Sequence, residues 1–78
     1  MTTFDRLIKV FDSVFEGEID TSGISLGDNL FEDVGMNSIG MLYMAMALEE
    51  EFGIKFKNDD FAAIKTVADV IETIEKKA

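Results

Sequence analysis

The chain has 78 residues, enough for one small domain that buries only about 60% of the surface exposed by its unfolded form. Sixteen acidic residues against seven basic ones give a formal net charge of −9, which disfavours nucleic acid and anionic membranes as partners. The chain has no cysteine and no histidine, so no disulfide or metal site is expected, and the commonest general base and the thiolate nucleophile are missing. It also lacks a membrane-spanning stretch and a secretory pattern, so we expect a single-domain, monomeric, cytoplasmic protein over residues 1–78.

The first predicted helix begins near Thr3, is capped by Thr2 or Thr3, and ends at Gly17. Its apolar residues recur at steps of three and four and share one face: Phe4, Leu7, Ile8, Phe11, Val14 and Phe15. A long ordered loop is expected from Gly17 to Asn37, because the helical period is lost and glycines interrupt the chain. Five apolar residues are expected to fix this loop to the core: Ile19, Ile24, Leu26, Leu30 and Val34.

The second helix is predicted to begin at Asn37 and Ser38 and to run to Phe52, with Gly53 ending it. A short third helix is expected near residues 58–63. The fourth is capped by Thr66 and ends at two lysines, and it is expected to bury Val67, Val70, Ile71 and Ile74. The predicted fold class is therefore all-α, a small four-helix bundle with three longer helices, one short helix and the loop after the first.

Residues 39–48 are apolar around the whole circumference of the second helix, and one small bundle cannot bury all of them. The face that suits the core carries Met41, Met44, Ala45, Leu48 and Phe52. The side chains left toward the surface are Ile39, Leu42, Tyr43 and Met46. An exposed apolar patch is typical of a partner-binding site, unless the loop at 17–37 folds over it. Negative charge that could steer a basic partner follows at Glu49, Glu50 and Glu51.

Ser38 lies where a glycine-containing loop becomes a helix. A group attached to its hydroxyl would lie near unpaired backbone N–H donors and the positive end of the helix dipole, where a phosphodiester is stabilised. Taken alone, Ser38 fits an ordinary N-cap, a role that Asn37 could also fill. Spacing by itself does not favour attachment over capping.

The run from Glu32 to Ile39, Glu-Asp-Val-Gly-Met-Asn-Ser-Ile, resembles the acyl carrier protein signature, in which an acidic, aliphatic, glycine stretch leads into Asp-Ser-Leu. The segment from Ala47 to Ile54 is similar to the family's second helix and its exit, and the resemblance covers essentially the whole chain. It implies that a phosphopantetheinyl transferase joins a 4′-phosphopantetheine arm to Ser38. The thiol at the tip of the arm would then carry acyl groups as thioesters, and the protein itself would catalyse nothing.

The resemblance also implies partners and a cargo. The partners would be acyl-transferring and acyl-modifying enzymes with basic or apolar docking patches, in fatty-acid, polyketide or related biosynthesis. The residues expected to contact them are Asn37, Ile39, Leu42, Tyr43, Met46, Glu49 and Glu50. In many family members the acyl chain folds back between the helices, and the candidate pocket residues are Met41, Met44, Ala45, Leu48, Phe52 and Ile64.

Four positions depart from the family pattern, and one of them, Ile39 in place of the usual leucine, is a nearly neutral change. Asn37 replaces the usual aspartate before the serine, so a neutral amide stands where a carboxylate would help the transferase assemble its magnesium site. Gly40 and Tyr43 occupy positions that are often acidic in fatty-acid carriers, which shifts recognition from charge toward apolar contact. Gly40 also costs the helix about 1 kcal/mol relative to alanine, which indicates a close approach at that point. We therefore expect a specialised rather than a housekeeping carrier.

Two other functions were considered. A degenerate carrier fold could bind partners as an adaptor without a prosthetic group, as the asparagine and the apolar patch would allow. An enzyme or calcium-binding module is suggested by the nearness in sequence of Asp28, Glu32, Asp33 and Asn37. Their spacing does not match the alternating ligands and terminal glutamate of an EF-hand loop.

Overall fold

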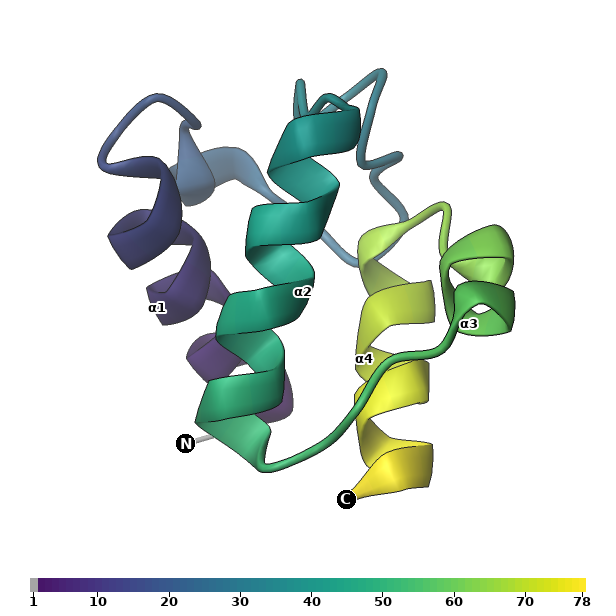
Figure 1. The fold of residues 1–78 in the computed structure, drawn as a ribbon. Coiled ribbons are helices and arrows are strands. Elements are labelled where there is room, and N and C mark those ends of the chain that lie inside the picture. The colour runs from purple at the N-terminus through teal and green to yellow at the C-terminus, as the bar shows by residue number, and fades with distance from the viewer. Residues whose placement is uncertain (1) are drawn as a thin grey trace.

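The computed structural model describes residues 2–78. Helices α1 (Thr3–Phe15), α2 (Ser38–Phe52), α3 (Asn58–Ala63) and α4 (Val67–Lys77) follow in order, with a 3-10 turn, η1 (Thr21–Gly23), in the long loop. The part of the chain described contains no strand, and the predicted all-α class is confirmed. Figure 1 shows α2 in the middle of the bundle, with α1 on one side and α4 and α3 on the other. Within residues 2–78, no helix is long and apolar enough to cross a membrane.

Helix α1 is capped by Thr2, the first of the two predicted candidates. The Thr2 hydroxyl accepts from the Asp5 backbone N–H at 3.1 Å, and the Asp5 carboxylate accepts from the Thr2 backbone N–H at 3.2 Å. The helix ends slightly earlier than predicted. Glu16, one residue before the predicted end at Gly17, already adopts a left-handed conformation at φ 47°, and its N–H donates to the Asp12 carbonyl.

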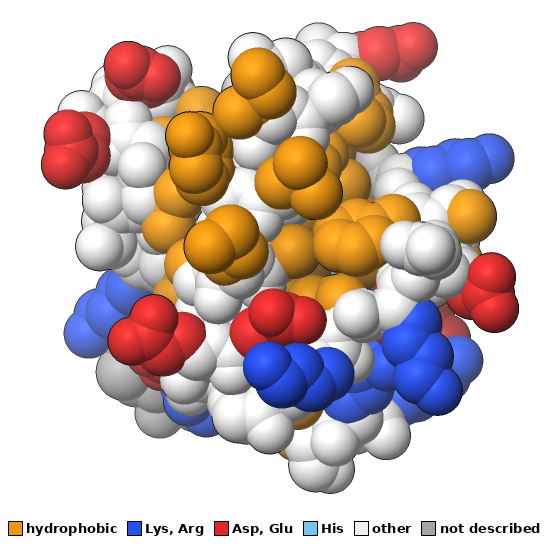
Figure 2. All heavy atoms as spheres, in the orientation of Figure 1, with side chains coloured by type: hydrophobic (Ala, Val, Ile, Leu, Met, Phe, Trp, Pro, Cys, Tyr) orange, Lys and Arg blue, Asp and Glu red, His pale blue; other side chains and the backbone are white. Residues whose placement is uncertain are grey.

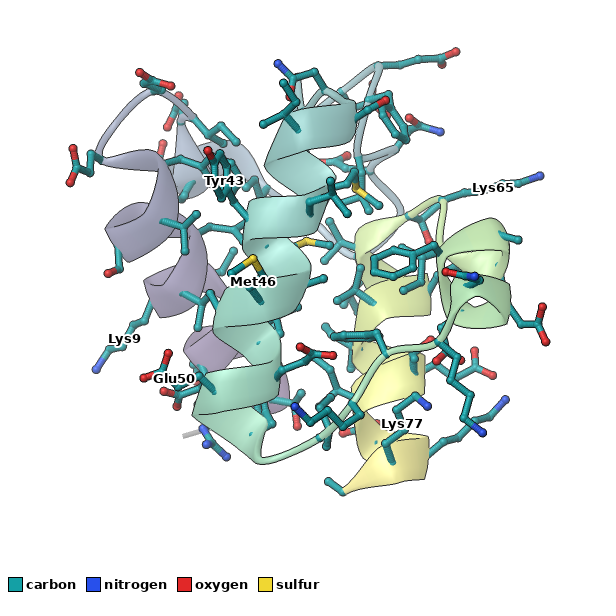
Figure 3. The ribbon with its side chains drawn as sticks, in the orientation of Figure 1. Lys9, Tyr43, Met46, Glu50, Lys65 and Lys77 are labelled. Carbon is teal, nitrogen blue, oxygen red and sulfur yellow. The ribbon has the colours of Figure 1, made fainter. Side chains whose placement is uncertain are left out.

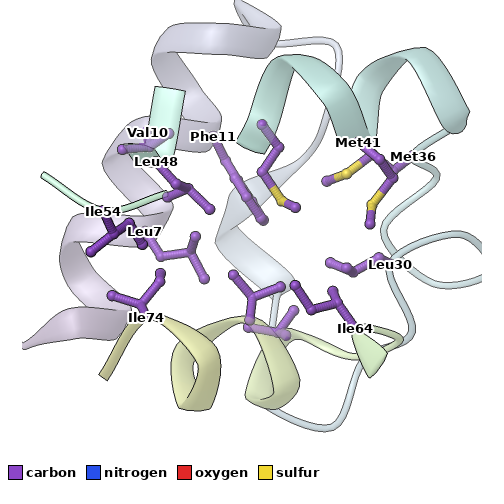
Figure 4. Close-up of a cluster of buried hydrophobic side chains, with 13 residues drawn as sticks. Leu7, Val10, Phe11, Leu30, Met36, Met41, Leu48, Ile54, Ile64 and Ile74 are labelled. Atoms are coloured by element: carbon purple, nitrogen blue, oxygen red, sulfur yellow. The ribbon is translucent and has the colours of Figure 1, made fainter. Parts of the chain in front are cut away.

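The core lies between α1, α2 and α4, and the loop and the segment after α2 contribute further side chains (Figure 4). Its buried members are Leu7, Val10, Phe11, Leu30, Met36, Met41, Met44, Leu48, Ile54, Ile64, Val67, Val70 and Ile74. Two residues expected in the core lie at its edge instead. Ile71 and Phe52 are only half-buried, because the other apolar residues of α4 and α2 already fill the space between the helices.

The long loop is fastened to the start of α4 by backbone hydrogen bonds. The amides of Val67 and Ala68 donate to the carbonyls of Asp28 and Leu26, at 3.0 and 2.8 Å. The loop's Leu30 side chain is fully buried, and Ile19, Ile24 and Val34 pack half-buried against the core, as predicted. Leu26 was predicted wrongly, since its side chain is 51% exposed. Its backbone, rather than its side chain, holds this part of the loop in place.

Thr66 caps α4 as predicted, and Asp69 completes the same capping box. The Asp69 carboxylate accepts from the backbone N–H groups of Lys65 and Thr66, both at 3.0 Å. These bonds stabilise the ionised carboxylate, so the backbone N–H of Lys65, followed by that of Thr66, holds the pKa of Asp69 below its ordinary value. The corner between α3 and α4, on which the loop rests, therefore depends on an ionised aspartate.

Helix α2 lies in the middle of the bundle. Shortening a side chain on its buried side should therefore lower the free energy of unfolding much more than shortening one on its exposed side. Leu48→Ala removes a fully buried side chain and should lower the free energy of unfolding by about 2–5 kcal/mol. Met46→Ala, two residues away on the exposed side, should change it by less than about 0.5 kcal/mol. Urea denaturation followed by circular dichroism measures both. Equal losses would show that α2 is not buried on the side described.

The Asp69 capping box predicts a dependence of stability on pH. A carboxyl group whose pKa is lowered by folding adds stability above its unfolded pKa, and that stability is lost as the pH falls through the folded pKa. At neutral pH, Asp69→Asn should therefore have a lower Tm than wild type, and the difference in Tm should shrink as the pH falls through the lowered pKa of Asp69. Thermal unfolding across this range is the measurement. Glu32→Gln, at an exposed residue, should keep the wild-type profile, and a constant gap between Asp69→Asn and wild type would contradict the account.

Candidate functional site

Ser38 is the first residue of α2, and its side chain is exposed. The N-cap is Asn37, whose side-chain oxygen accepts from the Gly40 backbone N–H at 2.7 Å. Within residues 2–78, the Ser38 hydroxyl makes no hydrogen bond. Of the two roles that the sequence left open for Ser38, capping is therefore already performed by its neighbour. The hydroxyl faces solvent and is available for attachment.

The N-terminal turn of α2 differs in charge from those of the other helices. An acidic residue lies in the first turn of α1, α3 and α4, whereas the first turn of α2 has none. The capping residue Asn37 is neutral as well. The positive end of the α2 dipole is therefore not compensated by a carboxylate of its own first turn, which favours an external anion such as a phosphodiester beside Ser38. These features fit a phosphate-linked group.

Gly40 allows the end of α1 to approach the first turn of α2 closely. A Cβ at this position would lie 3.1 Å from Met36 Cγ and 3.3 Å from both Asn37 Oδ1 and Phe15 Cε1. The close approach inferred from the sequence is therefore present. Phe15 in turn meets Phe11 edge-on, with ring centroids 6.0 Å apart, which ties the turn carrying Ser38 to the core.

The apolar residues predicted to remain on the surface of α2 are exposed. Ile39, Leu42, Tyr43 and Met46 are 57–65% exposed, so the loop does not fold over them, and that alternative was wrong. Figure 2 shows apolar side chains gathered over α2, with charged side chains concentrated below them. Phe31, which no pattern in the sequence marks as a surface residue, is 46% exposed in the loop. Its backbone N–H donates to the Asn29 side chain, in a turn that no periodic pattern marks.

The three consecutive glutamates of α2 have different surroundings. Glu49 accepts from the Phe56 backbone N–H at 2.7 Å and thereby holds the segment between α2 and α3. Glu51 forms an ion pair with Arg6 at 3.0 Å, and the Arg6 guanidinium also lies 4.2 Å from the centre of the Phe52 ring. Among the described residues, Glu50 has no such partner. Two of the three glutamates thus make polar contacts inside the molecule.

The candidate acyl-pocket residues come together in the packed core. Five are buried, namely Met41, Met44, Ala45, Leu48 and Ile64, and Phe52 is half-buried beneath Arg6. An open hollow of about 290 Å³ lies elsewhere, between the end of α1 and the start of α2. Its lining is mixed, with the apolar side chains of Phe15, Ile19 and Tyr43 beside the polar side chains of Glu18 and Asn37.

The acidic residues that suggested a calcium site stabilise local turns instead. The Asp28 carboxylate accepts from the Ser25 backbone N–H at 2.9 Å, and that of Asp33 accepts from the Asn29 backbone N–H at 2.7 Å. Across residues 2–78, no three acidic side chains gather in a way that could hold a metal ion. The same carboxylates give the loop its shape in front of Ser38.

The division of roles between Asn37 and Ser38 predicts unequal effects on stability. Asn37→Ala removes the cap of α2 and should cost about 1 kcal/mol of unfolding free energy. Ser38→Ala removes a hydroxyl without a hydrogen bond and should change stability by less than about 0.5 kcal/mol. Chemical denaturation of the two unmodified variants provides the comparison. A larger loss for Ser38→Ala would mean that the serine is the cap.

Comparison with known proteins agrees with this site. Residues 5–74 match the family model described as a phosphopantetheine attachment site. The chain is 36% identical over 58 residues to an acyl carrier protein of Sinorhizobium fredii, covering 74% of each chain. It is also 36% identical over 59 residues to that of Thermotoga maritima, covering 76% of this chain and 73% of the relative.

Solved structures share the fold. A T. maritima acyl carrier protein structure superposes with a TM-score of 0.80 at 20% identity, over 94% of this chain and 82% of the other. A structure from Mycobacterium tuberculosis, proposed to be an acyl carrier protein, gives 0.84 at 24% identity over 96% and 97%. This chain belongs to the acyl carrier protein family, whose members are carriers rather than catalysts and bear a covalent 4′-phosphopantetheine.

Proposed function

We propose that Ser38 is the attachment residue for 4′-phosphopantetheine and that this chain carries acyl groups as thioesters on that arm. The observation that carries the proposal is the exposed Ser38 hydroxyl, free because Asn37 supplies the cap of α2. When bound, the arm supplies a terminal thiol that forms the thioester. The protein's own contribution is to hold the phosphate at the start of α2, beside backbone N–H groups and an uncompensated helix dipole.

Side chains that surround Ser38 on α2 form the proposed docking surface. The transferase and the acyl-handling enzymes of the cytoplasm would contact the exposed members of the predicted set: Asn37, Ile39, Leu42, Tyr43, Met46 and Glu50. Glu49 remains in the proposed set. One of its two carboxylate oxygens, Oε2, accepts from the Phe56 backbone N–H at 2.7 Å, so this residue also positions the segment after α2.

We further propose that the buried candidate residues receive an acyl chain only after the bundle opens. The side chains of Met41, Met44 and Leu48 are buried, and none of them lines the hollows at the two ends of α2. Helix α3 should move aside most easily, because it contributes no buried residue. A Lys77–Asp60 ion pair at 2.9 Å connects it to α4. The neutral residues Asn37, Gly40 and Tyr43 support a specialised carrier of fatty-acid, polyketide or related biosynthesis.

The attachment proposal predicts a specific modification. Incubation with coenzyme A and a broad-specificity phosphopantetheinyl transferase should add one phosphopantetheine to the wild-type chain and none to Ser38→Ala, as read by intact-protein mass spectrometry. Ser13→Ala, at another exposed serine, should still be modified. Modification of Ser38→Ala, or no modification of the wild type by any transferase in a panel, would contradict the proposal.

The same variant distinguishes the adaptor function, which the exposed apolar residues of α2 favour. If the protein acts without an arm, its binding to an acyl-handling enzyme should be equal for modified wild type and for Ser38→Ala. We expect the arm to strengthen binding, because it adds a second, tethered contact in the partner's active site.

A further inference from the structure

The sulfur atoms of this chain all belong to methionine, because the sequence has no cysteine. Three methionines are buried in the core, where Met36, Met41 and Met44 are each 7% exposed or less. Figure 4 shows Met36 and Met41 inside the cluster of buried side chains. Met46, in contrast, is 65% exposed. Among residues 2–78 it is therefore the one methionine that a reagent in solution reaches while the bundle stays closed.

The surroundings of Met46 leave room for such a reagent. Figure 3 places Met46 along α2 between Tyr43 and Glu50. Its side chain lines an open hollow of about 410 Å³, together with Gly53 and Ile54 at the end of the helix. Met46 is not a member of the core cluster. A change in the polarity of its side chain should therefore leave the packing between the helices intact.

The thioether of a methionine reacts with peroxides. A lone pair of the sulfur attacks one peroxide oxygen, so that an S–O bond forms and the O–O bond breaks. The sulfur is oxidised and the peroxide is reduced. The proton of the transferred oxygen leaves with the released hydroxide as water. The product, methionine sulfoxide, is a polar side chain in place of a flexible apolar one.

We propose that Met46 is a reversible oxidation site for peroxide, and that its sulfoxide weakens the docking of acyl-handling enzymes beside Ser38. The effect on docking rests on the proposed function, in which Met46 contacts these enzymes together with Ile39 and Leu42. An apolar contact surface loses affinity when it has to bury a polar group that has no hydrogen-bond partner. The change is reversible, because a methionine sulfoxide reductase releases the oxygen as water while a dithiol is oxidised to a disulfide.

The site of oxidation is tested on the unmodified chain, which carries no thiol. After treatment with hydrogen peroxide and removal of the excess by catalase, proteolysis and tandem mass spectrometry locate each added oxygen. Met46 should gain its oxygen at least about tenfold faster than any of the three buried methionines, whose oxidation requires the core to open. The fragment that contains Met1 is counted separately. Circular dichroism should show the same helix content before and after oxidation.

Two leucine variants provide matched controls for the site. Met46→Leu should lose the fast reaction, whereas Met44→Leu, two positions away on the buried side of α2, should keep it. Both replacements nearly conserve the volume of the side chain, so both variants should fold. An oxygen that appears first on Met36, Met41 or Met44, or at equal rates on all four, would overturn the proposal.

The effect on docking is read from the rate at which a phosphopantetheinyl transferase adds the arm at low protein concentration, followed by intact mass. Oxidation of the wild type should slow attachment about fivefold or more. Methionine sulfoxide reductases that act on both epimers should restore the original rate when a dithiol is supplied. Met46→Leu, compared only with itself, should have the same rate before and after peroxide.

The possible failures are distinguishable in one set of samples. Sulfoxide at Met46 with an unchanged rate of attachment would overturn the effect on docking, and so would equal slowing of wild type and Met46→Leu by peroxide. Attachment that never occurs on any form of the chain would contradict the proposed function and, with it, the effect on docking. The location of the added oxygen is read without the transferase, so it tests the oxidation site independently of Ser38.

Discussion

Helix α2 is apolar around its circumference, and the chain has only α1, α4 and the long loop with which to cover it. One side is buried, with Met44 and Leu48 almost inaccessible to solvent, and the other side remains open. The buried side holds the bundle together through the hydrophobic effect, which grows with the apolar area removed from water. The open side leaves Ile39, Leu42, Tyr43 and Met46 exposed to solvent. Under the proposed function, stability and recognition therefore depend on the same helix but on different residues.

At the start of α2, two neighbouring residues perform two tasks that a single serine could otherwise perform: capping the helix and presenting a free hydroxyl. Asn37 caps the helix with a neutral oxygen, and Ser38 keeps a free hydroxyl at the first helical position. An aspartate at position 37 could also cap, but its charge would partly offset the dipole that favours the arm's phosphate. Under the proposed function, the neutral residue offers a transferase no carboxylate at the position next to the serine.

Local signals in the sequence were sufficient for the helices. The limits of α2 and α4 follow from the capping residues Asn37 and Thr66 and from Gly53, which adopts a left-handed conformation at φ 67°, as expected for a helix end. Exposure of apolar residues on the outer side of α2 was also predictable, because too many apolar residues compete for one small core. The family pattern, rather than spacing, predicted a role for Ser38 beyond capping.

Contacts between distant segments were not predictable in this way. Arg6 is 45 positions from Glu51, so no local pattern reveals that this glutamate is paired and that Glu50 is not. The exposure of Leu26 depends on backbone bonds to α4, which periodicity does not report. Such contacts decide which of several similar side chains is free to meet a partner. The residues of the proposed docking surface could therefore be narrowed down only from the structure.

The central claim is that Ser38 carries the arm, and its most direct test is peptide-level tandem mass spectrometry of protein purified from cells that produce it. After proteolysis, the fragment that contains Ser38 should bear phosphopantetheine, with fragment ions that place the group on that side chain. A fragment found only in its unmodified form, or a group located on another residue, would contradict the account.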